Sequence, residues 1–368
     1  MRRRILPFIV IAQSILFLGH FFIYETLVAL LAPSGRALIA LRIALAALSV
    51  TFVPASLLAW IYSNALVRTF YRVAATWLGM LTYVFLAACA SWIAYGIAAA
   101  IGRSEAKADI AYVLFGTGLL VGVYGVLNSM CIRVRHVTVK LPNLPAAWHG
   151  RFAAFVSDVH LGHVRGYRFA KRLAALLTGL APDIVLVGGD MYDGTKVDAE
   201  RLAEPLREIV TPLGTYFVAG NHEEFLDRGQ YLDAVKSSGV RVLNNEKVVV
   251  DGLQIVGVHH HESVNTELYR KILRQANLDP NCASILLTHE PVHLPVAAEE
   301  NIALQLSGHT HAGQFFPFTW ITKRIYGPFV YGLKRLGSLL VYTSCGVGTW
   351  GPPIRIGTAP EIVLIGFE

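Results

Sequence analysis

The stretch Phe152-Ala-Ala-Phe-Val-Ser-Asp158-Val-His160 is an apolar, strand-like run that ends in a carboxylate and an imidazole. Four later motifs also place such side chains beside glycine or directly after an apolar run: Gly188-Gly189-Asp190, Gly220-Asn221-His222-Glu223, His289 and Gly308-His309-Thr310-His311. Together they offer two carboxylates, one amide and four imidazoles as ligands. This set can hold two divalent ions that share a ligand, an arrangement suited to attack on phosphoesters.

Strand-like and helix-like runs alternate after residue 150. Strands are predicted at Phe152–Val156, Ile184–Val187, Tyr216–Val218, Leu253–Val258, Ile285–Leu287, Ala303–Leu306 and Ile362–Ile365. Helices are predicted at Tyr167–Leu180, Val197–Val210, Gln230–Ser238, Thr266–Gln275 and Leu294–Glu300. Each ligand motif directly follows a strand, and the carboxyl ends of strands are where α/β sheets gather their ligands. The motifs should therefore meet at one edge of a mixed sheet, or of two packed sheets, covered by helices.

Alternation within the motifs predicts how their side chains point. In an extended segment Asp158 and His160 would share one side, with Val159 turned away. The same reasoning applies to His309 and His311. Glycine beside the ligands would let the backbone approach an ion closely; these glycines are Gly188, Gly189, Gly220 and Gly308.

The order of these motifs resembles that of the calcineurin-like metallophosphoesterase superfamily, and the resemblance covers residues 150–368. It extends to membrane-associated bacterial members related to UDP-2,3-diacylglucosamine hydrolases. The resemblance implies an α+β, four-layer αββα sandwich. It also implies that Asp158, His160 and His311 bind one ion, that Asn221, His289 and His309 bind a second, and that Asp190 bridges the two.

The same resemblance implies a mechanism. His222 would protonate the leaving oxygen while a metal-activated water attacks phosphorus in line, and the carboxylate of Asp193 would orient the His222 ring. Oxygen and nitrogen ligands without thiolate favour two Mn²⁺, Fe²⁺ or Zn²⁺ ions, without choosing among them.

Other polar residues lie near the motifs, and the sequence allows more than one role for most of them. Glu223 is predicted to accept hydrogen bonds in support of the ligands, and Glu290 either does likewise or is solvated. His163 and Arg165 either reach substrate phosphate or belong to a surface loop. The triplet His259-His260-His261 is expected to be solvated or to face substrate.

The first 132 residues contain four long apolar runs, Leu6–Leu31, Leu38–Tyr62, Val73–Ile101 and Ile110–Ile132. Each exceeds the roughly 20 residues that cross a bilayer as a helix. We therefore expect an all-α bundle of four transmembrane helices over residues 1–132, a linker over 133–149 and a catalytic domain over 150–368.

The net charge of +7 resides mainly in the membrane part. Residues 133–368 carry 23 basic and 22 acidic side chains, which gives no support for nucleic-acid binding. The positive-inside rule places both ends of the helical part in the cytoplasm. This predicted orientation rests on the arginine and lysine residues at positions 2–4, 68, 72, 133, 135 and 140.

The segment 315–355 contains nine aromatic residues, five basic residues and no acidic residue. Such a composition is typical of a surface at an anionic lipid interface, although ordinary apolar packing is the alternative. It suggests membrane lipids as partners and a lipid or lipid-linked phosphoester or pyrophosphate as substrate. The alternatives are a phosphodiesterase or phosphatase for a soluble, phosphorylated small molecule, and a non-catalytic sensor or scaffold. The oligomeric state is not predicted.

Overall fold

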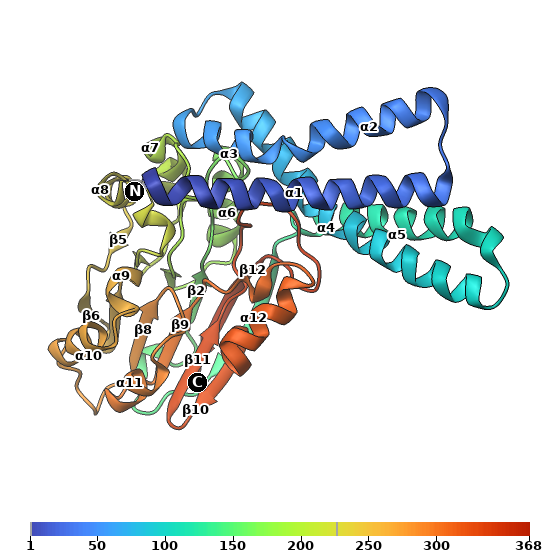
Figure 1. The fold of residues 1–368 in the computed structure, drawn as a ribbon. Helices are drawn as coiled ribbons and strands as arrows, with labels where there is room; N and C mark the ends of the chain where they lie inside the picture. The colour runs from blue at the N-terminus through green and yellow to red at the C-terminus, as the bar shows by residue number, and fades with distance from the viewer. Residues whose placement is uncertain (1, 226) are drawn as a thin grey trace. The chain divides into compact units, whose positions relative to one another are not determined.

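The computed structural model describes residues 2–225 and 227–368, without the side chains of residues 2–5 (Figure 1). The side chains of Arg2–Arg4, used above for orientation, therefore lie outside the described part. The chain forms two compact units. The first extends to Leu127 and includes Gly351–Ile354, and the second comprises Asn128–Trp350 and Arg355–Glu368.

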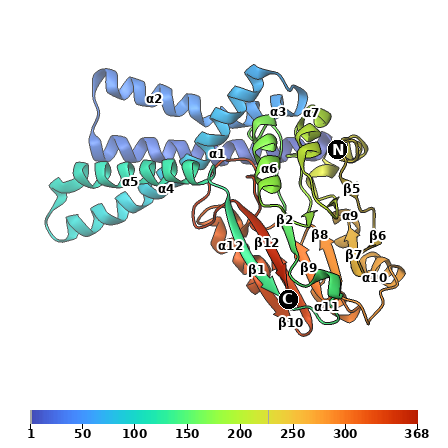
Figure 2. The same ribbon diagram turned by 180° about the vertical axis from the view of Figure 1, so that it is seen from behind.

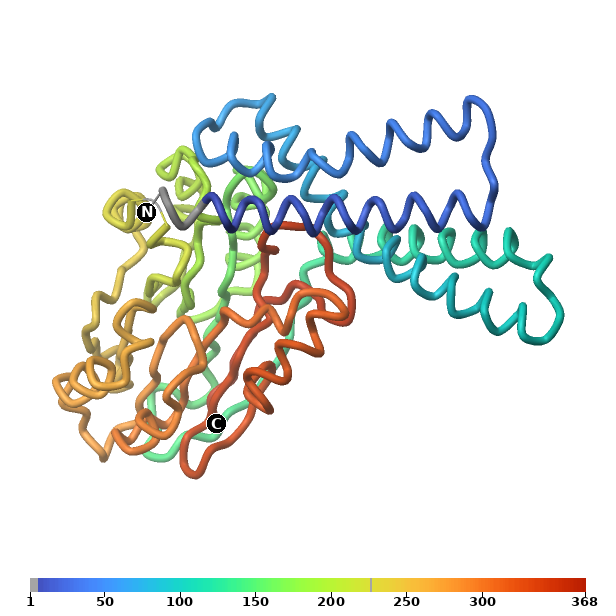
Figure 3. Tube along the Cα trace, viewed as in Figure 1, coloured from blue at the N-terminus to red at the C-terminus, as the bar shows by residue number. Residues whose placement is uncertain are grey.

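The first unit is helical. Its helices are α1 (Arg2–Leu31), α2 (Gly35–Ser49), α3 (Phe52–Ile61), α4 (Ala65–Ala100), the short η1 (Ser104–Ala106) and α5 (Lys107–Asn128), the last of which ends one residue into the second unit. The blue-to-cyan trace of Figure 3 follows them in order. Four stretches are long and apolar enough to cross a membrane: Leu6–Leu31, Gly35–Ile61, Ala65–Ala100 and Ser104–Asn128.

The second candidate span is broken, where the sequence predicted one continuous run. α2 ends at Ser49 and α3 begins at Phe52. Pro54 explains the break, because a proline ring clashes with the carbonyl four residues earlier, here that of Val50. The two helices still form one apolar stretch.

Polar side chains inside these helices bind one another or main-chain carbonyls. The indole of Trp77 donates to His20 Nε2 at 2.9 Å, and that of Trp92 donates to Thr26 at 2.9 Å. Gln13 donates to the carbonyl of Ser49. Interhelical hydrogen bonds of this kind are how polar groups are accommodated among helices in lipid.

The second unit contains two six-stranded sheets. The first has the order β1 (Arg133–Val139), β12 (Glu361–Phe367), β2 (Phe152–Val156), β3 (Ile184–Val187), β4 (Thr215–Phe217) and β5 (Arg241–Val242). The second has the order β10 (Gly332–Leu336), β11 (Leu339–Thr343), β9 (Leu304–Ser307), β8 (Ser284–Thr288), β7 (Leu253–Val258) and β6 (Glu246–Val250). Strands β2, β3 and β4 are parallel, as are β7, β8 and β9.

Strand alternation builds the layers. In β2, Phe155 faces the core shared by the two sheets, while Ala154 faces the core under the helices. In β8, Leu287 and Leu286 divide between the shared core and the opposite outer core in the same way. The helices that cover the first sheet are α6 (Tyr167–Gly179), α7 (Ala199–Ala203) and α8 (Arg228–Ser237), and those over the second are α10 (Thr266–Gln275) and α11 (Leu294–Glu299). The predicted helix–sheet–sheet–helix order is confirmed.

The stretch 133–149, expected to be a linker, contains β1. This strand pairs in parallel with β12 along its whole length, from Arg133 opposite Glu361 to Val139 opposite Phe367. Figure 2 shows the green first strand beside the red last one. The segment 315–355 likewise contains regular structure: helix α12 (Phe318–Tyr326), the short η6 (Gly327–Val330) and the hairpin of β10 and β11.

Candidate metal centre

The predicted ligands meet at one end of the sandwich because five neighbouring strands end there. Asp158 and His160 follow β2, Asp190 follows β3, and Asn221 follows β4. In the second sheet, His289 follows β8, and the loop with its two imidazoles follows β9. The strands are parallel within each set, so their carboxyl ends lie at the same edge.

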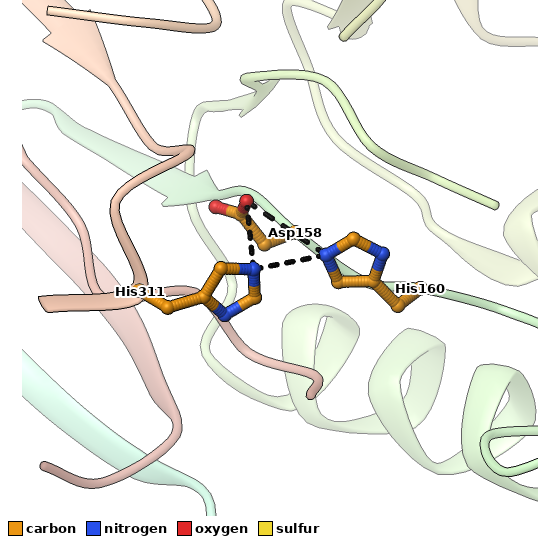
Figure 4. A group of neighbouring side chains, drawn as sticks. All are labelled: Asp158, His160 and His311. Atoms are coloured by element: carbon orange, nitrogen blue, oxygen red, sulfur yellow. Dashed lines mark hydrogen bonds and ion pairs between the residues drawn. The ribbon is translucent and has the colours of Figure 1, made fainter. Parts of the chain in front are cut away.

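One group of side chains comprises Asp158, His160 and His311 (Figure 4). The Nε2 atoms of the two imidazoles are 3.0 Å apart. Asp158 Oδ1 lies 3.3 Å from Nε2 of His311 and 3.9 Å from Nε2 of His160. These three side chains are almost completely buried and turn their ligand atoms toward one point.

A second group comprises Asn221, His289 and His309. Asn221 Oδ1 lies 3.1 Å from His289 Nε2 and 3.0 Å from His309 Nδ1. The two imidazole nitrogens are 3.2 Å apart. This group is as compact as the first.

Asp190 lies between the two groups. Its Oδ2 is 3.7 Å from His160 Nε2 in the first group and 3.2 Å from His289 Nε2 in the second. Its other oxygen, Oδ1, accepts a hydrogen bond from the main-chain N–H of His222 at 3.0 Å. One carboxylate oxygen is therefore fixed by the backbone and the other is directed at both groups.

The ligand loops are not extended, so the predicted reason for the shared direction of Asp158 and His160 is wrong. Asp158, His160, Asp190, His309 and His311 all have φ between 48° and 66°. This left-handed conformation costs roughly 1–3 kcal/mol for such residues and persists at functional sites where the surroundings enforce it. The loops turn sharply after each strand, and these turns make the side chains converge.

Glycines make this crowding possible, as predicted. A Cβ added to Gly220 would lie 2.1 Å from Asp190 Oδ1, and one added to Gly308 would lie 2.3 Å from Asp158 Oδ2. Both distances are far inside van der Waals contact. A side chain at either position would displace a predicted ligand.

The charges of the site favour a cation. Burial lowers the pKa of His160, His309 and His311, which keeps these imidazoles neutral. Burial would raise the pKa of Asp190, but His289 and His222 hold it well below its usual value. The site therefore combines an ionised carboxylate with three neutral imidazoles, the forms in which these groups bind metals.

Two observations test whether these residues fit metal ions. Ligands of one zinc-sized ion lie roughly 3–3.5 Å from one another, and six of the separations above fall between 3.0 and 3.3 Å. His289 donates from Nδ1 to the carbonyl of Gly188, and its Nε2 faces the oxygens of Asn221 and Asp190. Burial alone would lower the pKa of His289, yet Asp190 and the Gly188 carbonyl raise it to about 10. The site attracts positive charge at the position that a metal would take, and the residues fit.

Glu223 fastens two of the ligand loops together. Its fully buried carboxylate accepts hydrogen bonds from the main-chain N–H groups of Asp190, Tyr192 and Gly220, at 3.0, 3.1 and 2.7 Å. Burial, followed by the charge of Asp190, raises the pKa of Glu223 to about 7. Its predicted role as a hydrogen-bond acceptor is confirmed.

His222 faces the site with Nε2, 3.9 Å from Asp190 Oδ2. Its Nδ1 is 2.9 Å from the main-chain carbonyl of Asp193. The sequence assigned this contact to the Asp193 carboxylate, and that detail is wrong. The carboxylate instead accepts hydrogen bonds from the N–H and hydroxyl of Thr195 and from the N–H of His163. Asp193 orients the ring through its backbone, while its side chain shapes the loop.

The other polar residues that the sequence analysis placed near the ligand motifs occupy different positions. His163 and Arg165 are buried, and Arg165 donates to the carbonyl and hydroxyl of Ser129, so neither belongs to an exposed loop. His259 is buried and its Nδ1 accepts from the N–H of Ala219, which supports the β4 loop. His260 lies beside the second group, with its ring 5.8 Å from that of His309.

Sequence reasoning missed a contact between α12 and the second group. The Tyr326 hydroxyl donates to Glu290 Oε1 at 2.7 Å, and the other oxygen of Glu290 lies 3.2 Å from His260 Nε2. Glu290 Oε1 is also 3.8 Å from His309 Nε2. Burial would raise the pKa of Glu290, but the hydrogen bond from His260 and the proximity of His309 lower it to about 2. Nothing in the sequence relates position 326 to position 290.

Arg355 was counted among the basic residues of a lipid-facing segment, and the structure corrects this. Its side chain is completely buried. It donates to the carbonyls of His311 and Gly348, at 3.2 and 2.7 Å, and so ties the loop of one ligand to a neighbouring turn.

The chain is similar in sequence to known proteins. The family model for the calcineurin-like phosphoesterase matches residues 153–313. An uncharacterized metallophosphoesterase of Aquifex aeolicus is 32% identical over 256 residues, which cover 68% of this chain and 97% of that protein. One from Campylobacter jejuni is 32% identical, with 64% and 63% covered. A transmembrane protein with metallophosphoesterase domain from Danio rerio is 31% identical, with 67% and 60% covered.

The chain belongs to the calcineurin-like metallophosphoesterase family. Its second unit is a metallophosphoesterase domain, and the family implies a centre with two divalent ions, for which the two groups above are candidates. The matched region spans less than two thirds of the length of the Campylobacter and Danio relatives.

Proposed function

We propose that this protein is a membrane-anchored phosphoesterase with two metal ions that hydrolyses a phosphoester or pyrophosphate bond of a lipid or lipid-linked substrate. The observation that carries the lipid part is helix α12, which begins seven residues after His311 and exposes apolar and basic side chains. Its last residue, Tyr326, contacts Glu290 beside the second ligand group. A lipid head group guided by this helix would arrive next to the metals.

Seven residues would hold the ions: Asp158, His160 and His311 one, Asn221, His289 and His309 the other, and Asp190 both. When bound, the ions would activate water and neutralise charge on the phosphoryl oxygens. Mn²⁺, Fe²⁺ and Zn²⁺ all suit this ligand set.

His222 would supply the proton for the leaving oxygen. A protonated ring donates from Nδ1 to the Asp193 carbonyl, and that bond fixes Nε2 toward the site. The proton on Nε2 then lies on the side of Asp190, where the substrate phosphorus would bind. The carbonyl therefore orients the ring for proton donation from Nε2.

α12 has the features of a helix at an anionic lipid surface. Phe318, Ile321 and Ile325 are 45%, 45% and 69% exposed and recur at helical spacing. Trp320 is 58% exposed, and the Arg324 guanidinium lies over its ring. Exposed apolar rings and cations, in a segment (315–355) whose own sequence has no Asp or Glu, favour contact with lipid head groups.

The helix is firmly attached to the ligand loop. The Thr310 hydroxyl, between two imidazole ligands, donates to the carbonyl of Val330 in η6 at 2.8 Å. Gly313 approaches the backbone of Phe318 and Thr319 so closely that a Cβ would lie 2.5 Å from it. Docking of α12 on a membrane would therefore position the metal centre relative to the lipid surface.

A quadruple variant tests the lipid proposal: Trp320, Lys323, Arg324 and Ile325 all changed to alanine. Wild-type and variant, loaded with Mn²⁺, are compared on vesicles of a bacterial lipid extract, with products identified by mass spectrometry, and on soluble bis(4-nitrophenyl) phosphate. We expect loss of at least about tenfold on vesicles and little change on the soluble ester.

A control variant removes two apolar and two basic side chains that are exposed elsewhere in the domain: Val210, Val249, Lys196 and Lys271, all changed to alanine. It should retain both activities. Equal losses on both substrates in the α12 variant, or unchanged vesicle turnover, would favour the alternative of a soluble substrate.

The proposed location is the bacterial cell membrane, with the catalytic domain in the cytoplasm. This orientation rests on Arg68 and Arg72, in the first two turns of α4, and on the cations that follow the fourth span. Cleavage by a protease added to inside-out vesicles, but not to intact spheroplasts, is the expected result.

A further inference from the structure

Two large aromatic side chains flank the imidazole of His222. The Phe225 ring centroid is 4.5 Å from that of His222, and the Trp350 ring centroid is 5.7 Å away. On another side, the His160 ring lies 4.7 Å from His222. The proposed proton donor is therefore bounded by one ligand and two aromatic rings.

Both aromatic side chains are unusually exposed for groups beside a buried site. Phe225 is 44% and Trp350 57% exposed, whereas His222 is 4% exposed. Aromatic residues that only packed against the imidazole would bury most of their surface. Here a large part of each side chain remains available to another molecule beside His222.

The chain also holds Trp350 in place through its backbone. Gln314 donates from Nε2 to the Trp350 carbonyl at 3.1 Å and accepts from the Trp350 N–H at 2.9 Å. Two residues earlier, Gly348 donates to the carbonyl of Asp158 at 2.8 Å. The Trp350 indole thus projects from a turn whose backbone is hydrogen-bonded to the loop that carries Asp158 and to Gln314, which follows His311 in its loop.

The Phe225 ring packs closely against the backbone of the loop after β3. Gly194, with φ of 78°, lies against it, and a Cβ at that position would be 2.5 Å from the Phe225 ring. Gly194 directly follows Asp193, whose carbonyl orients His222. The loop that orients the proton donor therefore also leaves room for the ring.

We propose that Phe225 and Trp350 form a subsite that binds the leaving group of the substrate, and that this leaving group carries a flat aromatic ring. The inference rests on the proposed function, because it takes His222 as the group facing the leaving oxygen. A ring seated beside two aromatic side chains gains stacking interactions that an open-chain leaving group does not. The subsite is distinct from α12, on which the lipid part of the proposal rests.

The test compares two methyl diesters with chromogenic leaving groups, 4-nitrophenyl and the larger 4-nitro-1-naphthyl. The naphthol is the more acidic of the two, so the subsite is read from the change in preference between the wild type and each variant. Wild-type protein loaded with Mn²⁺ should prefer the naphthyl ester in kcat/KM. Phe225→Ala and Trp350→Ala should each lower this preference by about tenfold, because stacking on one ring is lost. Metal content is measured in each variant to show that the centre remains loaded.

Three further variants sharpen the test. Phe152→Ala removes a ring of the same exposed fraction, 44%, far along the strand from its ligand loop, and should keep the preference. Trp350→Phe should retain most of it, and Trp350→Leu, apolar but not flat, should lose it. A preference unchanged in both alanine variants, lowered equally by Phe152→Ala, or restored by leucine would overturn the proposal.

The same two esters are compared in the wild type and in each variant, so the difference in leaving-group acidity cancels. Calorimetry measures the affinities of 1-naphthylmethylphosphonate and benzylphosphonate for the protein. This comparison tests the subsite even if the protein hydrolyses neither diester. Tighter binding of the naphthyl compound that disappears in Trp350→Ala supports the subsite. Equal binding of both compounds by the wild type contradicts it.

Discussion

The main-chain N–H of Asp190 donates to the carboxylate of Glu223, with 3.0 Å between the two atoms. The same carboxylate binds the N–H groups of Tyr192 and Gly220, so one side chain joins the loops after β3 and β4. The position of Asp190 between the two ligand groups therefore depends on a residue that touches neither group.

Glu223→Gln should disturb this junction. The amide NH₂ would face main-chain N–H donors, and a buried donor without an acceptor costs about 1–3 kcal/mol. We expect a lower thermal midpoint and about 10–100-fold weaker metal binding, as for other residues that support ligands. Differential scanning fluorimetry and metal titration measure both. Glu246→Gln, on an exposed strand, should change neither.

Asp190→Asn should abolish hydrolysis and weaken the binding of both metal ions. The amide oxygen can still accept from the His222 N–H, so the fold should persist while the charge shared by both groups is lost. We expect metal content well below two ions per chain and activity lower by at least roughly 10³-fold. Asp233→Asn, whose side chain is 76% exposed, is the matched control. Retention of both ions by Asp190→Asn would contradict a shared ligand.

His222→Ala should keep the metals and lose rate in a manner that depends on the leaving group. For poor leaving groups the deficit should reach about 10²–10⁴-fold, and it should shrink as the leaving group becomes more acidic. Rates for a series of aryl esters, with metal analysis of each sample, provide the measurement. His261→Ala, an exposed imidazole, should leave the series unchanged. A constant deficit would indicate that His222 only binds phosphate.

His259 should make the protein less stable in acid. Burial, with a smaller contribution from Arg228, lowers its pKa to about 4 from a usual 6.5. The unfolded chain takes up the proton below 6.5 and the folded chain only below 4, so stability present above 6.5 is lost as the pH falls between these values. At about pH 5 the loss is about 2 kcal/mol. His259→Asn keeps an acceptor for the Ala219 N–H and removes the titration. Its unfolding midpoint should therefore fall less than that of the wild type between neutral pH and pH 5.

The sequence predicted the interior strands with the exception of β11 (Leu339–Thr343), and it predicted the edge strands poorly. β2, β3 and β7 have the predicted bounds because strands buried on both faces form continuous apolar runs. β6 and β10 were missed: they pair on one side only, and β10 carries Lys334 and Arg335, which are typical of sheet edges. Their pattern does not differ from that of a polar loop.

For the site, residue types and order predicted a set of side chains that the structure brings together, but not the contacts that hold them in place. The left-handed backbone at Asp158 and His160 follows from the turn that each loop makes after its strand, which no side-chain pattern encodes. The burial of Arg355 depends on carbonyls brought together by tertiary structure. The contacts of Tyr326 and Trp350 join loops far apart in sequence, and single-sequence periodicity cannot detect them.

The pairing of β1 with β12 imposes an order on biosynthesis. β12 lies between β1 and β2, so the strand that follows the last apolar helix has no neighbour until residues 361–367 have been made. While the helices are entering the bilayer, β1 and one edge of β2 would remain open to pairing with other chains. Ribosomes stalled before residue 361 should therefore display a domain sensitive to proteases and bound by chaperones. When the stall site is placed far enough beyond residue 368 for residue 367 to clear the exit tunnel, the ribosomes should display a domain that resists proteases.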